Sequence, residues 1–230
     1  MQNPFPYIIR DNTFWVSSER CLYWEERNTL VVTDLHLGKA GHFRKSGIAI
    51  PQDVYKADLQ RLMAQLYFFK ADRLIIVGDF THSTANKELE LFKKWRNDFS
   101  LLQIELVKGN HDILEDEWYS ESRISVRVGQ WMFSDFLFIH EVSHHFPAAN
   151  GELTSPKKSA GTNYIFSGHV HPCIIMKGRG KQSLRLPCFY FTRDHCILPA
   201  FSKFTGTYIV EPRKGEIIFA IAEKRLIQIS

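Results

Sequence analysis

The sequence predicts an α/β fold, with parallel strands and helices in its first half and closely spaced strands in its second half. Apolar runs at 30–33, 73–77 and 101–107 have the composition of buried strands. They are separated by stretches with apolar residues at intervals of three and four, the spacing of a helix packed on one face. Strand, helix and strand in succession predict parallel pairing with right-handed crossovers. With 230 residues and no internal repeat or linker, the chain is expected to form one domain over residues 1–230.

A hairpin at 13–16 and 21–24 is expected to precede the strand at 30–33, because both of its runs are aromatic and β-branched. The first helix is expected to begin at Pro51, since proline suits the first helical position. The predicted buried faces of the two helices consist of Tyr55, Leu59, Leu62, Met63, Leu66 and Phe69, and of Leu89, Phe92, Trp95 and Phe99.

Beyond Trp118 the apolar runs are short and follow one another closely, so we expect mainly strands in the second half. A polar segment at 151–161 is expected to form a solvated loop. The predicted strands lie at 124–128, 131–133, 136–139, 164–166, 173–176, 183–186, 189–192, 207–210 and 217–221.

The composition is that of a soluble globular protein, with 44% hydrophobic and 23% charged residues. The four cysteines lack C-x-x-C spacing and are expected to be reduced and buried, as in a cytoplasmic protein. The N-terminus has no signal-peptide pattern, and no apolar run approaches the ~20 residues of a membrane span. The net charge of +4 permits an anionic partner without requiring one. We therefore predict a cytoplasmic protein that does not associate with membranes.

Five loops that directly follow predicted strands carry side chains able to bind metal. In an extended chain, residues i and i+2 point to the same side, so Asp34 and His36 can contact one cation. In open α/β sheets the ligand usually binds at the edge formed by the carboxyl ends of the strands. The side chains in these loops are Asp34 and His36, Asp79, Asn110 and His111, His140, and His169 and His171.

Carboxylate and imidazole ligands together suit Mn, Fe, Co or Zn better than Ca or Mg. No cysteine belongs to the set, which argues against a structural zinc site. The ligands are too many for one ion. They fit two ions ~3.5–4 Å apart, an arrangement common among phosphate-ester hydrolases. The pattern therefore predicts a dinuclear metal site.

Taken in chain order, these loops form a series of short motifs. The motifs are Asp34-x-His36, Gly78-Asp79, Gly109-Asn110-His111-Asp112, His140 and Gly168-His169-x-His171. The series resembles the calcineurin-like metallophosphoesterase superfamily. This resemblance implies a four-layer α/β/β/α metallophosphoesterase sandwich, in which two mixed sheets are flanked by helices and the dinuclear site lies at one edge.

The resemblance also implies a role for each residue. The expected metal ligands are Asp34, His36 and His171 for one ion, Asn110, His140 and His169 for the other, and Asp79 as the bridge. His111 is expected to face the substrate and protonate the leaving oxygen, with Asp112 orienting it.

Further motifs accompany these ligands along most of the chain. They are Asp34-Leu35-His36-Leu37-Gly38-Lys39, Phe43-Arg44-x-x-Gly47-Ile48-x-Ile50-Pro51, Gly78-Asp79-x-x-His82-Ser83, His140-Glu141, Gly168-His169-x-His171-Pro172 and Leu198-Pro199-Ala200-Phe201-x-x-Phe204-Thr205-Gly206. Together they resemble the DNA-ligase-associated metallophosphoesterases, a family of DNA damage response endonucleases. The resemblance implies a Mn-dependent DNA endonuclease or phosphodiesterase, with Zn, Fe or Co as alternative metals. It also implies a ligase, a helicase and an exonuclease as repair partners.

Two other functions stay open on the sequence alone. One is a phosphodiesterase or phosphatase acting on a small nucleotide or a lipid-linked pyrophosphate. The other is an inactive interaction module that keeps the fold. The sequence does not choose between monoester and diester substrates, and it leaves the native metals and the oligomeric state open.

Several polar residues outside the ligand set have two interpretations each. His82 lies three residues after Asp79 and is expected either near the metals or as a cap of the next helix. Lys39, Arg44 and Lys45 fit either phosphate contacts or a solvated loop.

A basic hairpin is interpreted as solvated, with contact to a DNA backbone as the alternative. Its residues are Lys177, Arg179, Lys181 and Arg185. The histidines expected at the surface or beside the ligands are His42, His144, His145 and His195.

Overall fold

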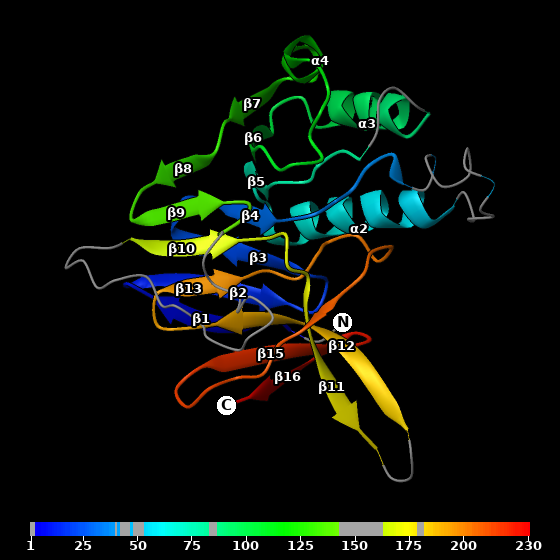
Figure 1. Cartoon of the computed structure of the whole chain (residues 1–230). Helices are drawn as coiled ribbons and strands as arrows, with labels where there is room; N and C mark the ends of the chain where they lie inside the picture. Colours follow the sequence, from blue (N-terminus) through cyan, green and yellow to red (C-terminus); the bar gives the residue numbers. More distant parts are fainter. Residues whose placement is uncertain are drawn as a thin grey trace.

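Two mixed β-sheets lie face to face at the centre of the molecule, and helices pack on the outer side of one of them (Figure 1). The structure is a computed structural model that describes residues 3–39, 41, 47, 53–82, 87–142, 163–178 and 182–230. The predicted α/β metallophosphoesterase-type sandwich of two mixed sheets is confirmed, but among the described residues helices flank only the first sheet, whereas the expected four-layer order requires them on both.

The first sheet consists of β1 (Phe5–Ile9), β2 (Asn12–Ser17), β3 (Cys21–Trp24), β4 (Thr29–Val32), β5 (Arg73–Val77), β6 (Gln103–Val107) and β7 (Ile124–Arg127), in that spatial order. Strands β1 to β4 pair antiparallel, and β4 to β7 pair parallel. The predicted hairpin and the parallel strands are confirmed. Strand β1 was not predicted, because it is a largely exposed edge strand that contains a proline.

Helices cover the face of the first sheet that points away from the second. They are α2 (Asp53–Phe69), α3 (Lys87–Asp98) and α4 (Asp116–Glu121), whereas the short 3-10 turn η1 (Glu25–Arg27) connects β3 to β4 and buries no side chain. Leu62 and Leu66 of α2 and Phe92 of α3 are buried in one cluster with Leu74 of β5, as the spacing of apolar residues predicted. The expected start of the first helix at Pro51 lies outside the described residues.

The second sheet consists of β8 (Gln130–Phe133), β9 (Phe136–Ile139), β10 (Tyr164–Ser167), β11 (Pro172–Lys177), β12 (Ser183–Phe191), β13 (His195–Ile197), β14 (Tyr208–Ile209), β15 (Ile217–Ala222) and β16 (Arg225–Ile229). Its central order is β14-β11-β12-β13-β10-β9-β8, and β15 pairs with β12 and β16. The two strands predicted at 183–186 and 189–192 form one strand, with Pro187 accommodated opposite Cys173. The distal part of the β11–β12 hairpin projects away from the sandwich (Figure 1).

Successive side chains of a strand point to opposite faces of the first sheet, so they belong to two separate hydrophobic cores. In β4, Leu30 and Val32 pack against the helices, whereas Val31 packs against the second sheet. The core between the sheets is aromatic, with the ring of Phe14 centred 4.9 Å from that of Phe166. Both faces of β4 are therefore buried, which explains its uninterrupted apolar run. All four cysteines are buried and free, as predicted.

Pairing places the functional loops at one edge of the sandwich. Strands β4, β5 and β6 are parallel, so their carboxyl ends lie together. In the second sheet β9 and β10 are also parallel, and the loops that follow them meet those of the first sheet. No helix among the described residues is long and apolar enough to cross a lipid bilayer.

Candidate dinuclear metal site

Six side chains at the carboxyl ends of four strands form two adjacent clusters. Within each cluster, one ligand atom from every residue lies within 4.8 Å of the others. The first cluster consists of Asp34, His36 and His171, and the second of Asp79, His140 and His169. A distance of 4.0 Å between Nδ1 of His140 and Oδ1 of Asp34 joins the two clusters.

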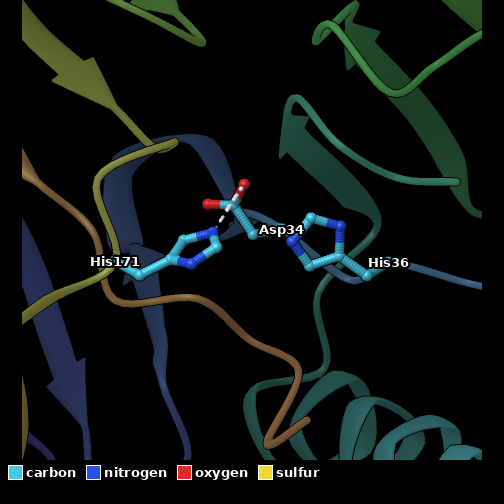
Figure 2. Close-up of side chains that lie close together, drawn as sticks. All are labelled: Asp34, His36 and His171. Atoms are coloured by element: carbon cyan, nitrogen blue, oxygen red, sulfur yellow. Dashed lines mark ion pairs between the residues drawn. The ribbon is translucent and has the colours of Figure 1, made fainter. Parts of the chain in front are cut away.

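The first cluster is turned inward around a common point (Figure 2). Nε2 of His171 lies 3.3 Å from Oδ1 of Asp34, and the ring of His36 is centred 5.4 Å from that of His171. Among the described residues, Oδ1 of Asp34, Nε2 of His171 and both ring nitrogens of His36 are buried without a hydrogen-bond partner. Unsatisfied polar atoms are costly to bury, and a bound cation would satisfy all three side chains.

The second cluster has the same character. Nε2 of His140 lies 3.3 Å from Oδ1 of Asp79 and 3.3 Å from Nδ1 of His169. Three potential ligand atoms thus face one another, one from each residue. Two nitrogens and one carboxylate oxygen form a donor set that suits a divalent transition metal.

Neighbouring groups determine which ring nitrogen of two histidines faces the metal. Nδ1 of His171 lies 3.1 Å from the carbonyl oxygen of Gly206, and Nδ1 of His140 lies 3.0 Å from that of Val77. A carbonyl only accepts, so Nδ1 carries the hydrogen in both rings and Nε2 is left for the metal. These contacts of Val77 and Gly206 could not be predicted from side-chain patterns, because both residues act through their backbone carbonyls.

The backbone of the ligand loops is strained. Five predicted ligands have a positive φ, an unfavourable conformation for residues other than glycine. Their φ angles are 52° for Asp34, 50° for His36, 45° for Asp79, 68° for His169 and 52° for His171. Such residues cost about 1–3 kcal/mol each and persist where surrounding contacts hold them, typically at functional sites.

Asn110 and His111 lie beside the second cluster. Asn110 lines a surface hollow of about 360 Å³ together with Gly109, His140 and Glu141. The backbone N–H of His111 donates to Oδ1 of Asp79 at 3.0 Å. Its Nε2 lies 3.9 Å from Oδ2 of Asp79, and 44% of its side chain is exposed. The imidazole of His111 therefore borders both the second cluster and the solvent.

Comparison with known proteins agrees with this arrangement. Residues 27–173, more than half of the chain, match the family model of the calcineurin-like phosphoesterases. The chain belongs to the calcineurin-like phosphoesterase family. The matched residues include every residue of both clusters.

Solved structures add one informative relative of this phosphoesterase. The nuclease MPE of Pseudomonas putida is 29% identical, with a TM-score of 0.78, covering 99% of this chain and 100% of that one. The phosphoesterase Yfce of E. coli is 14% identical over 87% of this chain and 97% of its own, with a TM-score of 0.41. Protein AQ665 of Aquifex aeolicus, of unknown function, is 19% identical over 66% of this chain and 82% of its own, also with a TM-score of 0.41. A search of curated proteins found no match.

In this phosphoesterase the carboxylate of Asp112 connects two of the ligand loops. Its Oδ1 accepts the backbone N–H of Thr81 at 2.8 Å, and its Oδ2 accepts that of Gly109 at 2.9 Å. Burial outweighs these hydrogen bonds and raises the pKa of Asp112 to about 6. Asp112 thus fixes the loop after β5 relative to the loop that carries His111.

His82 lies at the site, as one of its two interpretations predicted. Its ring is centred 4.3 Å from that of His111 and 5.4 Å from that of His36. His195 is buried behind the site, where its Nε2 lies 2.7 Å from the hydroxyl oxygen of Ser167. The other residues with open interpretations that lie outside the described residues are His42, Arg44, Lys45, His144, His145, Arg179 and Lys181.

The charges of the two clusters are coupled. Burial and the ammonium group of Lys39 lower the pKa of His36 to about 3. Burial also lowers the pKa of His140, but the hydrogen bond to Asp79 and the charges of Asp34 and Asp79 outweigh it and raise this pKa to about 9. In the metal-free protein at neutral pH, His36 is therefore neutral, whereas His140 is a positively charged imidazolium with hydrogens on both ring nitrogens.

This proton predicts how metal binding depends on pH. A metal must displace the proton of His140, so we expect affinity at the second cluster to rise about tenfold per pH unit from 6.5 to 9. In the metal-free protein the free energy of unfolding falls as pH rises, because the pKa of His140 is higher in the folded protein than in the unfolded chain. The stability from protonated His140 is fully present below about pH 6.5 and is lost as pH rises through 9. Calorimetric titration with Zn in buffers of different ionisation enthalpy should detect about one released proton near pH 7.5. An affinity independent of pH would contradict the assignment.

The loop at 198–206 forms hydrogen bonds with two residues of the first cluster. The backbone N–H of Ser202 donates to the carbonyl of Asp34 at 3.1 Å, and the carbonyl of Gly206 contacts His171. Through these bonds the loop fixes ligands that come from β4 and from the segment after β10.

A buried group of charges holds this loop. Asp58 and Arg61 of α2 form an ion pair of 3.0 Å, and the guanidinium of Arg61 donates to the carbonyl of Phe201 and lies over its ring. Arg20 donates to the carbonyl of Ser202 at 2.9 Å. Two arginines thus satisfy backbone acceptors of the loop, at a depth where an unpaired carbonyl would be costly.

Removing one partner of this ion pair should be strongly destabilising. Arg61→Met would leave the buried carboxylate of Asp58 unpaired, which typically costs about 3–5 kcal/mol. For a chain of this size the melting temperature should fall by roughly 6–20 °C. Arg127→Met is the matched control, because it breaks a more exposed pair with Glu105 and should cost about 1 kcal/mol or less. Equal melting temperatures for the two variants would contradict the assignment.

Proposed function

We propose that this calcineurin-like phosphoesterase is a dinuclear enzyme that hydrolyses phosphodiester bonds, with Mn as the favoured metal and DNA as the substrate. The observation that carries the proposal is the pair of adjoining ligand clusters with the half-exposed imidazole of His111 beside them. Whole-chain similarity to a Pseudomonas putida nuclease supports a nucleic acid over other diesters, and the choice of DNA rests on the resemblance to the repair-associated family. We also propose that residues 1–230 form a single domain and that the protein acts in the cytoplasm.

The candidate ligands form two sets, one for each proposed ion. In this proposal Asp34, His36 and His171 would hold one ion, His140, His169 and Asn110 would hold the other, and Asp79 would be a ligand shared by both. Bound divalent metals supply charge stabilisation to the phosphoryl oxygens and lower the pKa of water. The hydrogen bonds to Val77 and Gly206 fix the rings of His140 and His171 so that Nε2 of each would be available to an ion.

His111 is proposed to donate a proton to the leaving oxygen. Its backbone is fixed by Asp79, and its ring is packed against that of His82, so the exposed edge has a defined direction. Asp112 contributes by holding the loop that carries His111, through hydrogen bonds to Thr81 and Gly109.

Two further features fit a nucleic-acid substrate. The net charge of +4 is favourable for a polyanion, and Lys177 and Arg185 on the projecting β11–β12 hairpin are exposed. We propose a ligase, a helicase and an exonuclease as functional partners, on the resemblance to the repair-associated family.

The proposed function is tested with metal-stripped protein reloaded with Mn, Zn or Mg. We expect hydrolysis of bis-p-nitrophenyl phosphate that requires Mn and is faster than hydrolysis of p-nitrophenyl phosphate. In a separate assay, the Mn-loaded protein should nick supercoiled plasmid. His111→Ala should lower plasmid nicking by about 10²–10⁴-fold. It should lower hydrolysis of the p-nitrophenyl diester much less, because that leaving group needs little protonation.

Each outcome distinguishes the proposal from its competitors. Hydrolysis of the monoester alone would replace it with a small-molecule phosphatase. Two bound metals without hydrolysis of either ester would indicate an interaction module. Equal effects of His111→Ala on plasmid and on the p-nitrophenyl diester would contradict the role of His111 as the acid.

A further inference from the structure

One ammonium group reaches the metal site from the loop that follows β4. The backbone N–H of Lys39 donates to the carbonyl of His36 at 3.1 Å, so the lysine lies one tight turn beyond a predicted ligand. Its Nζ donates to the hydroxyl oxygen of Thr205 at 3.3 Å, and this oxygen lies 3.0 Å from Nδ1 of His171. Lys39 therefore spans from one ligand of the first cluster to the residue beside another.

Both ends of the lysine are held by buried structure. The carboxylate of Glu88, which is 5% exposed, accepts the backbone N–H of Gly38 at 2.7 Å and that of Gly41 at 3.0 Å. At the other end, Thr205 belongs to the loop that Arg61 anchors. The position of the ammonium group is thus fixed by the fold.

The hydrogen-bonding capacity of this pair is only partly used. Nδ1 of His171 carries one hydrogen, because it faces the carbonyl of Gly206, and it shares this hydrogen between that carbonyl and the hydroxyl oxygen of Thr205. The same hydroxyl oxygen also accepts from Lys39. The hydrogen of the Thr205 hydroxyl is then available to a ligand. An ammonium group has three donors, and among the described residues the bond to Thr205 uses one of them.

The electrostatics of the site call for an anion at this point. Lys39 is half-buried, and its ammonium group interacts electrostatically with the carboxylates of Asp34 and Asp79. Two divalent cations would outweigh these two carboxylates, so Lys39 in the metal-loaded protein would face excess positive charge. An anionic ligand between the ions and the ammonium group would offset that repulsion.

We propose that Lys39 and Thr205 form an anion subsite on the Asp34–His36–His171 side of the metal centre, which binds a non-bridging oxygen of the substrate phosphate. The ammonium group donates to that oxygen, and the Thr205 hydroxyl supplies a second donor. This inference rests on the proposed function and adds a substrate contact outside the metal ligands. It also separates two interpretations of the sequence, since Lys39 then contacts phosphate instead of belonging to a solvated loop.

The test uses inorganic phosphate as the probe and full-length, metal-loaded protein. Metal content is measured first, and phosphate affinity is then measured by isothermal titration calorimetry. Lys39→Met should retain two metals and bind phosphate roughly 10–100-fold more weakly, since a charge-assisted hydrogen bond is lost. Lys39→Arg should stay within a few-fold of the wild type. Thr205→Val, which keeps the ammonium group, should weaken phosphate binding several-fold.

The matched control is Lys203→Met, which removes an equal charge from an exposed lysine of the same loop as Thr205 and should leave phosphate affinity unchanged. The proposal is overturned if Lys39→Met binds phosphate like the wild type, or if Lys203→Met weakens it equally. It is also overturned if Lys39→Met loses metal and phosphate together, since Lys39 would then support the metal ligands. Phosphate binding does not depend on diester turnover, so failure of the proposed activity would be seen separately.

Discussion

Asp79→Asn is expected to lower kcat/KM for diester hydrolysis by at least about 10³-fold, which corresponds to about 4 kcal/mol of transition-state stabilisation. The asparagine keeps the shape and can still accept the backbone N–H of His111, which lies 3.0 Å from Oδ1. It lacks the negative charge that contacts His140 at 3.3 Å and that we propose lies between the ions. Steady-state kinetics at saturating Mn, together with metal content, would measure the effect.

A second readout of the same variant does not require activity. The charge of Asp79 helps to raise the pKa of His140, so Asp79→Asn should reduce the proton release that accompanies metal binding near pH 7.5. Asp116→Asn is the control, because it neutralises an exposed carboxylate paired with Lys108. Wild-type kinetics in Asp79→Asn would remove Asp79 from the metal site.

Gly78→Ala is expected to displace the ring of His140 and to abolish metal binding at the second cluster. Gly78 has a φ of +80°, and a Cβ at this position would overlap with the ring of His140, including Nδ1. That nitrogen bonds the carbonyl of Val77, so the ring would have to leave the orientation that presents Nε2 to Asp79. Overpacking together with the left-handed backbone should cost about 2–5 kcal/mol, or roughly 4–20 °C in melting temperature.

Gly215→Ala is the matched control for this substitution. Gly215 also has a positive φ, of 90°, but a Cβ there would meet no atom within 4 Å. Only the backbone cost of about 1–2 kcal/mol should appear, with metal content unchanged. If Gly78→Ala keeps both metals and melts like Gly215→Ala, the close packing of His140 on Gly78 is not required for the site.

The two predictions share one structural cause. Asp79 directly follows Gly78. In this turn the backbone of Gly78 packs closely against the ring of His140, and the carboxylate of Asp79 contacts the same ring. The positive φ of Asp79 and of other ligands shows how sharply these loops bend after their strands. Bound metal would compensate such strain, so we regard the ligand loops as held jointly by neighbouring contacts and by metal.

Local pattern in the sequence was sufficient for the architecture of the first sheet and for the location of the ligand loops. The apolar run of β5 is buried on both faces, with Ile75 toward the second sheet and Ile76 toward the helices, and periodicity reports this directly. A polar residue after such a run lies at the strand end, which is where Asp79 is found. Edge strands such as β1 and β16 lack this signal, because part of each is exposed.

The clusters themselves depend on contacts between distant parts of the chain. Asp34 accepts the backbone N–H of His169 across 135 residues of sequence, and no local spacing encodes that approach. Only the resemblance to a known family assigned ligands to separate ions from the sequence, and only the coordinates show which atoms face each other.

The sequence by itself determined the α/β class, the two amphipathic helices and the loops that carry the candidate metal ligands, because each of these is a short-range pattern of side-chain types. Tertiary structure alone placed His82 against His111, directed Asp112 to the backbone of Thr81, and brought Lys39 to Thr205. These outcomes depend on the direction in which a side chain leaves a packed loop. That direction is set by neighbours far away in sequence, and residue spacing carries no information about it.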